Sequence, residues 1–340
     1  MSITIKEIAK LAGTSRGTVD RVINKRGNVK PELEEKINSI IEEYNYKPNI
    51  NAKLLGKYRK IFKIGVILNS LGNEFYDDVK QGIYGSLDRL NEYNVQVIMK
   101  EIKGYNPIEI INKIDEVLAE GVDAIAITPI NESRVIKKLI ENEKKIPIAL
   151  INSGLESVEY ITKVVANNIL IGKIAANLTM IYARDNDKIA ISTGSLLNTS
   201  NRDRVEGFIS VIDRDKNKKL RIVKILEVLD DDDISYKQTK ALLEQHEDLK
   251  LIFLSAYGVK GAIRAINEKK SKAVLVTVDF SRDIEEALKE GVAIATITQD
   301  PFEQGYRPLV SLAEYLVFNT KCEKTVLTES KIILKESLNV

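Results

Sequence analysis

The feature that most limits the fold of this chain is the alternation, from Ile61 onward, of short apolar runs with amphipathic segments. The runs that we expect to form strands are KIGVILN, VQVIMKEI, AIAIT, PIALIN, KIAIST, RIVKILEV, LIFLS, AVLVTVD and IATITQ. We expect helices between them, for example at 77–91, 107–120, 132–143, 168–183, 203–213 and 257–269. This rhythm predicts parallel sheets with helices on both faces. The number of strands favours two doubly wound lobes over a single sheet.

The charge of the chain is unevenly distributed. The 340 residues are 44% hydrophobic and 29% charged, which indicates a globular chain with more than one core. Residues 1–60 contain 13 Lys and Arg against 7 Asp and Glu, a net charge of +6, which leaves 38 against 42, or −4, for the remainder. A basic N-terminal segment is typical of a nucleic-acid-binding domain.

Composition also limits the compartment and the chemistry. The single cysteine, Cys322, cannot form an internal disulfide, and the N-terminus MSITIKEIAK lacks the apolar core of a signal peptide. We therefore expect a cytoplasmic protein without a membrane partner. The single histidine, His246, lies among charged residues, and no phosphate-binding glycine motif follows a strand, so we expect no metal, cofactor or catalytic residue. The acids from Asp230 to Asp233 could bind a hard cation, but they directly precede a helix and are expected to complement its dipole.

Residues 3–46 carry the signals of three short helices. Thr4 and Glu7 match a capping box before a helix from about Ile5 to Ala12, and Gly13 is expected to end it. Ser15 is placed to cap a second helix, and Pro31 suits the first position of a third. The apolar residues expected to form their common core recur at helical spacing: Ile5, Ile8, Ala9, Leu11, Val19, Val22, Ile23, Leu33, Ile37, Ile40, Ile41 and Tyr44.

The outer face of the second helix has the chemistry of a base-contacting surface. If its apolar residues face inward, the opposite side carries Arg16, Gly17, Asp20, Arg21 and Asn24. Arg16 or Arg21 can form two hydrogen bonds to a guanine edge, while hydroxyl groups at the start of this helix suit phosphates. The alternative for the isolated helix is a solvated surface with an ion pair between Arg16 and Asp20.

The segment TIKEIAKLAGTSRGTVDRVINKRGNVKPELEEKI, followed by YNYKPNINAKLLG, resembles the DNA-binding headpiece and hinge of the LacI family of bacterial transcriptional repressors. The match covers nearly all of residues 3–56. It implies that positions 16, 17 and 20 contact bases and that Leu55 of each subunit enters the minor groove at a central base step. Lys53 stands where the family usually has arginine, and a flexible basic linker is the alternative for this hinge. The positions expected at DNA are Thr4, Ser15, Arg16, Gly17, Thr18, Asp20, Arg21, Asn24, Asn28, Tyr46, Asn49, Ala52, Lys53 and Leu55.

The residues that follow the expected strands indicate a binding cleft, because ligands bind at the carboxyl ends of parallel strands. Asn73, Phe75 and Tyr76 follow the first strand, and aromatic faces with an amide suit a sugar. The alternative is that the two rings only cap the sheet.

Residues 61–340 resemble the type I periplasmic sugar-binding fold, especially its ribose-binding-like members, which is also the LacI-family effector domain. The resemblance matches Arg204, Asp279 and Gln299 to ligand-holding residues, as it does Asn73, Phe75 and Tyr76. Elsewhere this chain departs from the ribose-binding pattern: Asn152 and Ser153 replace an Asp-Arg pair, Asn167 replaces an acid, and Ser255 and Ala256 replace an Asn-Asp pair. The retained residues suit a neutral polyol.

We therefore expect a sugar-responsive homodimeric repressor on a palindromic DNA operator, with a higher oligomer left open. The expected domains are a headpiece over 1–46, a hinge over 47–60 and an effector domain over 61–340. Its N-lobe is expected at about 61–162 and 293–322, and its C-lobe at about 163–292 and 323–340. The alternatives are a transport or chemotaxis sugar-binding protein, an α/β enzyme acting on a sugar phosphate, and the same regulator with a nucleobase or other non-sugar effector.

Overall fold

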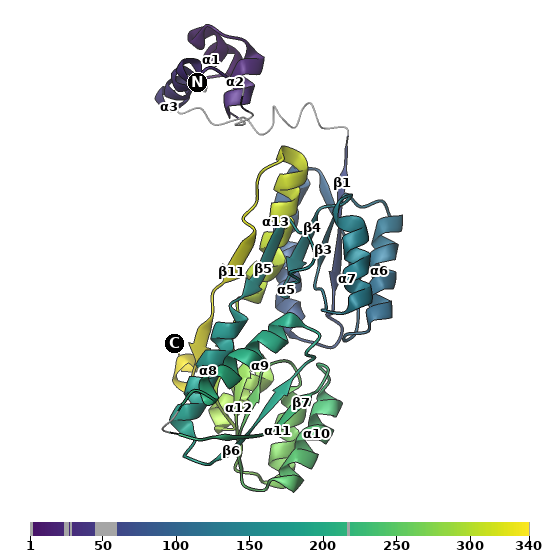
Figure 1. Ribbon diagram of the computed structural model, residues 1–340, viewed down its shortest axis with the longest axis vertical. Helices are drawn as coiled ribbons and strands as arrows, with labels where there is room; N and C mark the ends of the chain where they lie inside the picture. Colours follow the sequence, from purple (N-terminus) through teal and green to yellow (C-terminus); the bar gives the residue numbers. More distant parts are fainter. Residues whose placement is uncertain (1–2, 24–26, 28, 45–59, 216–217, 340) are drawn as a thin grey trace. The chain divides into compact units, whose positions relative to one another are not determined.

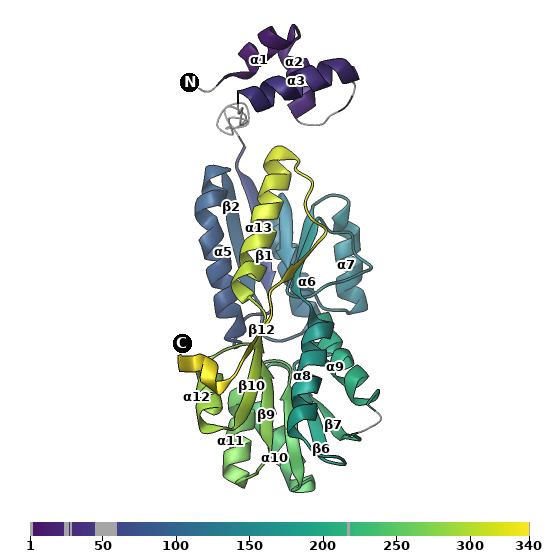
Figure 2. The same cartoon turned by 90° about the vertical axis from the view of Figure 1, so that its left-hand side faces the viewer.

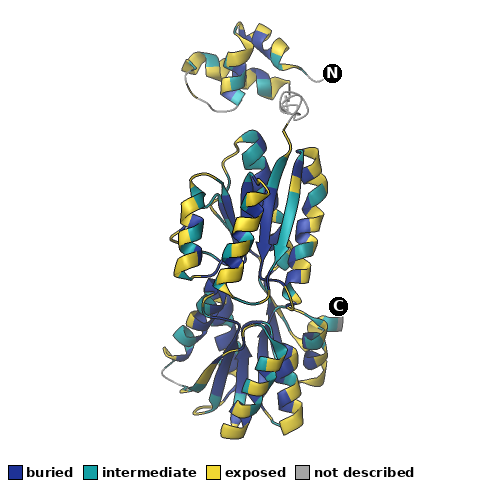
Figure 3. Cartoon of the chain, turned by 90° about the vertical axis from the view of Figure 1, so that its right-hand side faces the viewer, coloured by how far each residue is buried: buried dark blue, intermediate teal, exposed yellow. Residues whose placement is uncertain are grey.

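The computed structural model describes residues 3–23, 27, 29–44, 60–215 and 218–339. The chain divides into two compact units, Met1–Lys60, here called the headpiece unit, and Ile61–Val340, here called the two-lobed unit. Figure 3 shows that buried residues line the inner faces of the elements in each unit. Each unit therefore has its own core and is described separately.

The headpiece unit contains the helices α1 (Ile5–Ala12), α2 (Arg16–Ile23) and α3 (Pro31–Glu43). At the start of α1 the Thr4 hydroxyl accepts a hydrogen bond from the Glu7 N–H at 3.3 Å, and the Glu7 carboxylate accepts from the Thr4 N–H at 2.8 Å. These two bonds satisfy N–H groups that the helix itself cannot bond. The predicted capping box is therefore present.

The turn between α1 and α2 also follows from its residues. Gly13 has a φ of 71°, and the Ser15 hydroxyl accepts from the Thr18 N–H at 3.1 Å at the start of α2. Of the residues predicted for the core, Leu11 is 48% exposed and Tyr44 is 49% exposed, so these two assignments were wrong. Three short helices enclose only a narrow core, which the neighbouring apolar side chains fill: Ile8, Ala9, Ala12, Val19, Val22, Ile37 and Ile40.

The two-lobed unit contains two six-stranded sheets in which every pair of neighbouring strands is parallel except β10 and β12. The first sheet has the order β11-β5-β4-β3-β1-β2 and the second the order β12-β10-β9-β8-β6-β7. The strands of the first sheet are β1 (Phe62–Leu68), β2 (Val95–Glu101), β3 (Ala124–Ile127), β4 (Ile148–Ile151), β5 (Thr162–Ala166) and β11 (Thr325–Thr328). The strands of the second are β6 (Lys188–Thr193), β7 (Arg221–Glu227), β8 (Leu249–Leu254), β9 (Val274–Val278), β10 (Ala293–Thr298) and β12 (Lys331–Ile333).

Helices cover both faces of each sheet, as Figures 1 and 2 show. The helices of the first lobe are α5 (Phe75–Glu92), α6 (Pro107–Ala119), α7 (Ser133–Glu143) and α13 (Pro301–Phe318). Those of the second lobe are α8 (Asn168–Tyr182), α9 (Thr199–Ile212), α10 (Asp232–Gln245), α11 (Val259–Lys269) and α12 (Arg282–Glu290), followed by the 3-10 turn η1 (Lys335–Asn339). Successive side chains of β8 point to opposite faces of the sheet. Leu251 and Phe253 pack toward α8 and α9, whereas Ile252 and Leu254 pack toward α10 and α11.

The predicted class of two doubly wound parallel-sheet lobes is confirmed, but the predicted lobe boundaries were partly wrong. Strand β10, expected in the N-lobe, pairs with β9 in the second sheet, and β11, expected in the C-lobe, pairs with β5 in the first. Residues 163–166, expected in the C-lobe, belong to β5, which pairs with β4 and β11 in the first sheet. The predicted strands also missed β5, β11 and β12. An apolar run indicates that a strand forms, but the run does not indicate which sheet the strand joins. Among the described residues, no helix is both long and apolar enough to cross a membrane.

Facing glycines let α5 and α13 pack at backbone distance in the first lobe. A Cβ at Gly82 of α5 would lie 1.9 Å from the carbonyl oxygen of Phe302, and a Cβ at Gly305 of α13 would lie 2.0 Å from that of Val79. In the second lobe α8 and α9 meet in the same way, because a Cβ at Gly172 would lie 2.0 Å from the Arg204 carbonyl oxygen. Any side chain at these positions would push the two helices apart.

Gly82→Ala is expected to lower the free energy of unfolding of the two-lobed unit by about 2 kcal/mol or more, despite the better helix propensity of alanine. Urea denaturation of the full chain measures this change. Asp88→Ala, on an exposed site of the same helix, is the matched control and should stay within about 0.5 kcal/mol of the wild type. Equal stability of the wild type and Gly82→Ala would contradict the close approach of α5 and α13.

Candidate functional site

The headpiece unit presents an exposed basic face on α2. Arg16, Gly17 and Arg21 are exposed, whereas Val19 is fully buried. Gly17 and Arg21 lie four residues apart and therefore on the same side of the helix. A Cβ at Gly17 would meet only Ser15 Oγ, at 3.7 Å, which is an ordinary contact. Packing within the headpiece unit does not require glycine at this position, so the face can carry a different side chain without rearrangement.

The other predicted DNA-contacting positions divide into two sets. Thr18 and Asp20 are partly buried, the Ser15 and Thr18 hydroxyls lie 3.0 Å apart, and Thr4 is engaged in the capping box. The remaining positions lie outside the described residues, and their contact with DNA stays a prediction: Asn24, Asn28, Tyr46, Asn49, Ala52, Lys53 and Leu55.

The residues after β1 reach the space between the two lobes. Asn73 Oδ1 accepts from the Phe75 N–H at 3.1 Å, and its Nδ2 donates to Asp230 of the second lobe at 3.2 Å. The rings of Phe75 and Tyr76 meet edge to face, with their centroids 5.1 Å apart. Tyr76 is only 3% exposed, and all three residues line the cleft. An amide and two aromatic rings are therefore placed together, as the sequence indicated.

Arg204 of α9 lies at the centre of the cleft. Its buried guanidinium donates to three acceptors: Asn168 Oδ1 at 2.7 Å, the Ser255 carbonyl oxygen at 2.6 Å and Gln299 Oε1 at 2.9 Å. Burial lowers the pKa of Arg204, and the carboxylate of Asp279 opposes this shift. Because the three acceptors are uncharged, the positive charge is balanced only by carboxylates farther along the cleft.

Gln299 connects Arg204 to the carboxylate of Asp279. Its Nε2 donates to Asp279 Oδ1 at 2.6 Å while its Oε1 accepts from the guanidinium. Burial raises the pKa of Asp279, and the charge of Arg204 acts in the opposite direction. Asp279 has a φ of 75°, a conformation that is strained for a residue with a side chain and that is common at functional sites. Donors and acceptors thus lie side by side, as the hydroxyl groups of a polyol require.

A second amide, Gln304 of α13, joins this network to the first lobe. Its Nε2 donates to the Gln299 carbonyl oxygen at 2.8 Å, and its Oε1 accepts from Asn152 Nδ2 at 2.9 Å. The Thr328 hydroxyl donates to the same carbonyl oxygen of Gln299 at 2.7 Å. Asn152 lines the cleft as predicted, and its side chain is also held by Gln304 of α13.

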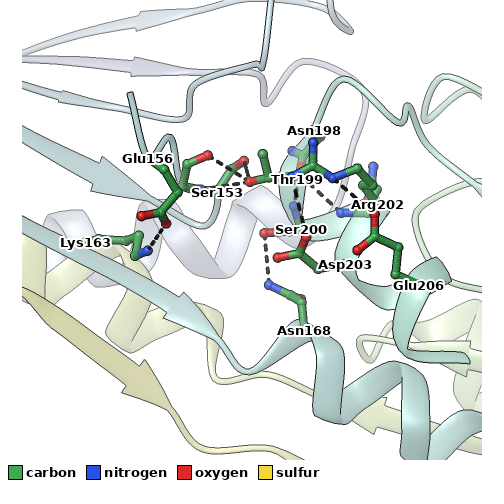
Figure 4. Close-up of polar contacts among 12 residues, drawn as sticks. Ser153, Glu156, Lys163, Asn168, Asn198, Thr199, Ser200, Arg202, Asp203 and Glu206 are labelled. Carbon is green, nitrogen blue, oxygen red and sulfur yellow. Dashed lines mark hydrogen bonds and ion pairs between the residues drawn. The ribbon is translucent and has the colours of Figure 1, made fainter. Parts of the chain in front are cut away.

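The structure does not bring Asn167, Ser153 or the Ser255 side chain to the cleft. Asn167 is exposed and caps α8 by accepting from the Leu170 N–H at 3.1 Å, whereas its neighbour Asn168 faces Arg204. Figure 4 shows the Ser153 and Thr199 hydroxyls in contact, at 2.9 Å, and Asn168 Nδ2 donating to Ser200. The Ser255 hydroxyl donates to Thr193 at 2.9 Å, and only its backbone serves Arg204.

Sequence reasoning missed Asp230 and Tyr105. Asp230 was expected to complement a helix dipole, but its side chain lies in the cleft, where Oδ2 accepts from Asn73 Nδ2 and from the Tyr105 hydroxyl. Tyr105 Oη accepts in turn from Asn201 Nδ2 at 3.3 Å. Burial raises the pKa of Asp230 to about 6. Both residues follow a strand, β7 or β2, and this position was the available signal. Further lining residues are Asn198, Asn201, Ala256 and Tyr257.

The lobes are closed over this site. The lining side chains leave a space of about 20 Å³, which is near the volume that one water molecule needs. A cavity of about 350 Å³ adjoins it and shares Phe75, Asp279 and Gln299 with it. The lobes must therefore separate before a molecule of sugar size can reach Arg204. In the described part of the chain no three His, Cys, Asp or Glu side chains come together in a way that could hold a metal ion.

Comparison with known proteins links each unit to a family. Residues 64–320 match the model of the periplasmic binding protein domain, and residues 4–49 match that of the bacterial regulatory proteins of the lacI family. The ribose import binding protein RbsB of Salmonella typhimurium is 24% identical over 282 residues, which cover 80% of this chain and 90% of that protein. Catabolite control protein A of Staphylococcus xylosus is 31% identical over 150 residues, 44% of each chain.

A solved structure supports the fold alone. GanP, a glucose-galactose binding protein from Geobacillus stearothermophilus, superimposes with a TM-score of 0.75 at 22% identity, over 83% of this chain and 100% of that chain. Neither of the two matched families is a family of enzymes. The arrangement around Arg204 therefore has to be understood as a binding site.

Asp230→Asn is expected to raise the melting temperature of the two-lobed unit by several degrees at pH 7 and by little at pH 4. Burial raises the pKa of Asp230 to about 6, whereas an aspartate in the unfolded chain has a pKa of about 4. Between these two pH values the folded chain keeps a proton that the unfolded chain has lost. The destabilisation from the buried carboxylate is therefore absent below about pH 4 and complete above about pH 6. Differential scanning fluorimetry across this range measures the difference.

Asp231→Asn is the matched control and should show the opposite sign. A hydrogen bond from the Ile234 N–H lowers the pKa of Asp231, so its charge stabilises the folded chain above about pH 4 and loses this effect as the pH falls. Parallel pH profiles for the two variants would contradict the assignment of Asp230 to the cleft and Asp231 to the helix cap.

Proposed function

The chain belongs to the periplasmic binding protein family and, through its LacI-family domain, is a DNA-binding transcription regulator, and we propose that it is a repressor controlled by a small sugar or polyol. One observation carries the proposal: the chain combines an exposed basic helix face, Arg16 with Arg21, and an interlobe cleft in which Arg204, Gln299 and Asp279 place donors beside acceptors. The names of two relatives, one for ribose import and one for catabolite control, support it.

In this proposal the cleft and the headpiece unit are coupled through the movement of the lobes. In the structure the side chains of Asn73, Asp230 and Asp279 form hydrogen bonds to other protein groups. When the lobes close on a sugar, its hydroxyl groups replace some of these protein partners. Effector binding changes operator affinity by a coupling free energy of about 1–3 kcal/mol. The predicted hinge, 47–60, transmits the change from the effector domain, 61–340, to the headpiece, 1–46. The protein acts in the cytoplasm as a homodimer on a palindromic operator, with one headpiece on each half-site.

Arg16→Ala is expected to weaken binding to a specific operator about 5- to 150-fold, because an arginine that forms two hydrogen bonds to guanine contributes about 1–3 kcal/mol of discrimination. The operator is located by footprinting the full-length protein on the promoter region of its own gene. Gel shifts at fixed salt concentration then compare the variants, and a sugar that stabilises the protein in thermal-shift assays should change the wild-type affinity.

Lys36→Ala is the matched control, since it removes one exposed positive charge from α3 of the same unit. It should weaken binding less than Arg16→Ala and to the same extent on specific and random DNA. Equal effects of the two variants, or no protected palindrome on the promoter, would count against the proposed repressor.

A further inference from the structure

The four consecutive acids after β7 have two separate roles. Asp231 caps α10, where its Oδ1 accepts from the N–H groups of Asp233 at 3.0 Å and Ile234 at 3.1 Å. Just before it, Leu229 and Asp230 adopt left-handed backbone conformations, with φ values of 54° and 55°. Two successive residues with side chains in this region are costly, at about 1–2 kcal/mol each. The turn directs Asp230 away from the helix and into the cleft.

Groups from both lobes enclose the Asp230 carboxylate. From the first lobe, Asn73 Nδ2 and the Tyr105 hydroxyl donate to Oδ2. Oδ1 is buried and has no hydrogen-bond partner among the described residues. Gly194 makes room for it, since a Cβ there would lie 2.4 Å from Oδ1. One oxygen of Asp230 is thus left to accept a hydrogen bond from a molecule that enters between the lobes.

The charge of the cleft is negative. Its lining includes the carboxylates of Asp230 and Asp279 against the single guanidinium of Arg204. Lys103 of the first lobe pairs with Asp231 at 3.4 Å, and it is not among the residues that line the cleft.

The adjoining cavity has the same sign. Besides Asp279, it is lined by Asp78, Asp300 and Glu329 against Lys331, and Lys331 pairs with Glu329 at 3.0 Å. An anion would meet carboxylates along this cavity as well as at Asp230, and repulsion is least screened at the buried Asp230.

We propose that Asp230 selects the effector by charge, so that the cleft admits uncharged or positively charged sugars and excludes anionic ones such as uronates and sugar phosphates. This inference rests on the proposed sugar effector and narrows its class. Asp230 accepts from a sugar hydroxyl or ammonium group, whereas a second carboxylate or a phosphate beside its unpartnered oxygen is repelled.

Isothermal titration calorimetry on the full chain at pH 7.5 tests the proposal with three charge series: the neutral sugar, the 2-amino sugar and the uronate of glucose, galactose and mannose. The wild type should bind the neutral or amino sugar of a series at least about tenfold more tightly than the uronate. Asp230→Asn keeps an oxygen for Asn73 and Tyr105 and should reduce that ratio about tenfold. Asp231→Asn removes a neighbouring charge that faces the helix and Lys103, and it should leave the ratio unchanged.

Repeating the wild-type titrations at pH 5 supplies a test without mutation. Uronates stay ionised there, whereas Asp230, with its pKa raised to about 6 by burial, is largely protonated, so discrimination against uronates should fall. Burial also raises the pKa of Asp279, which faces the cleft beside Arg204, so the Asp230→Asn titration repeated at pH 5 separates the contribution of Asp230 from that of Asp279. Tighter wild-type binding of a uronate than of its neutral sugar overturns the charge selection but leaves a sugar effector intact. Binding of no sugar from any series overturns both.

Discussion

The buried guanidinium of Arg204 donates to uncharged acceptors, and these hydrogen bonds hold together the segments that connect the two lobes. Asn168 begins the second lobe directly after β5, and Gln299 lies where the chain returns to the first lobe. Gln304 and Thr328 extend the same network to the last connection. A buried charge is tolerated only when its donors are satisfied, so these segments have to converge on α9. The position of the cleft follows from this requirement, because the residues that hold Arg204 also line the space that a ligand would occupy.

Features that depend on near neighbours in the chain could be predicted from the sequence. The capping box at Thr4, the left-handed turn at Gly13 and the cap at Ser15 each involve residues within three positions of one another, and all three are present. The class of the fold was equally accessible, because the period of the apolar residues differs between helices and strands. The resemblance to a known family supplied Arg204 and Gln299, whose roles depend on contacts between distant segments.

Features that depend on distant partners were not accessible in this way. The apolar pattern of β10 predicts a strand whereas β11 was missed, and neither segment shows in its own residues which sheet it joins. At the start of α8, a shift of one residue turns a side chain by about 100°, so Asn168 meets Arg204 while Asn167 caps the helix. Asp230 was hidden for a third reason, because in a run of identical residues nothing local distinguishes the one that faces the cleft.

That run of identical residues affects how the gene can change. The loss of any one of the four aspartates yields the same shorter chain, in which an aspartate still follows Leu229 and another still precedes the helix. The cleft acid and the cap of α10 therefore use interchangeable copies of one residue type. A shorter run would still leave an acid for each of these two positions, but every later residue of α10 would turn by about 100° about the helix axis. Ser235, Thr239 and Leu242 would then leave their buried positions, so the length of the run is fixed by the packing of α10.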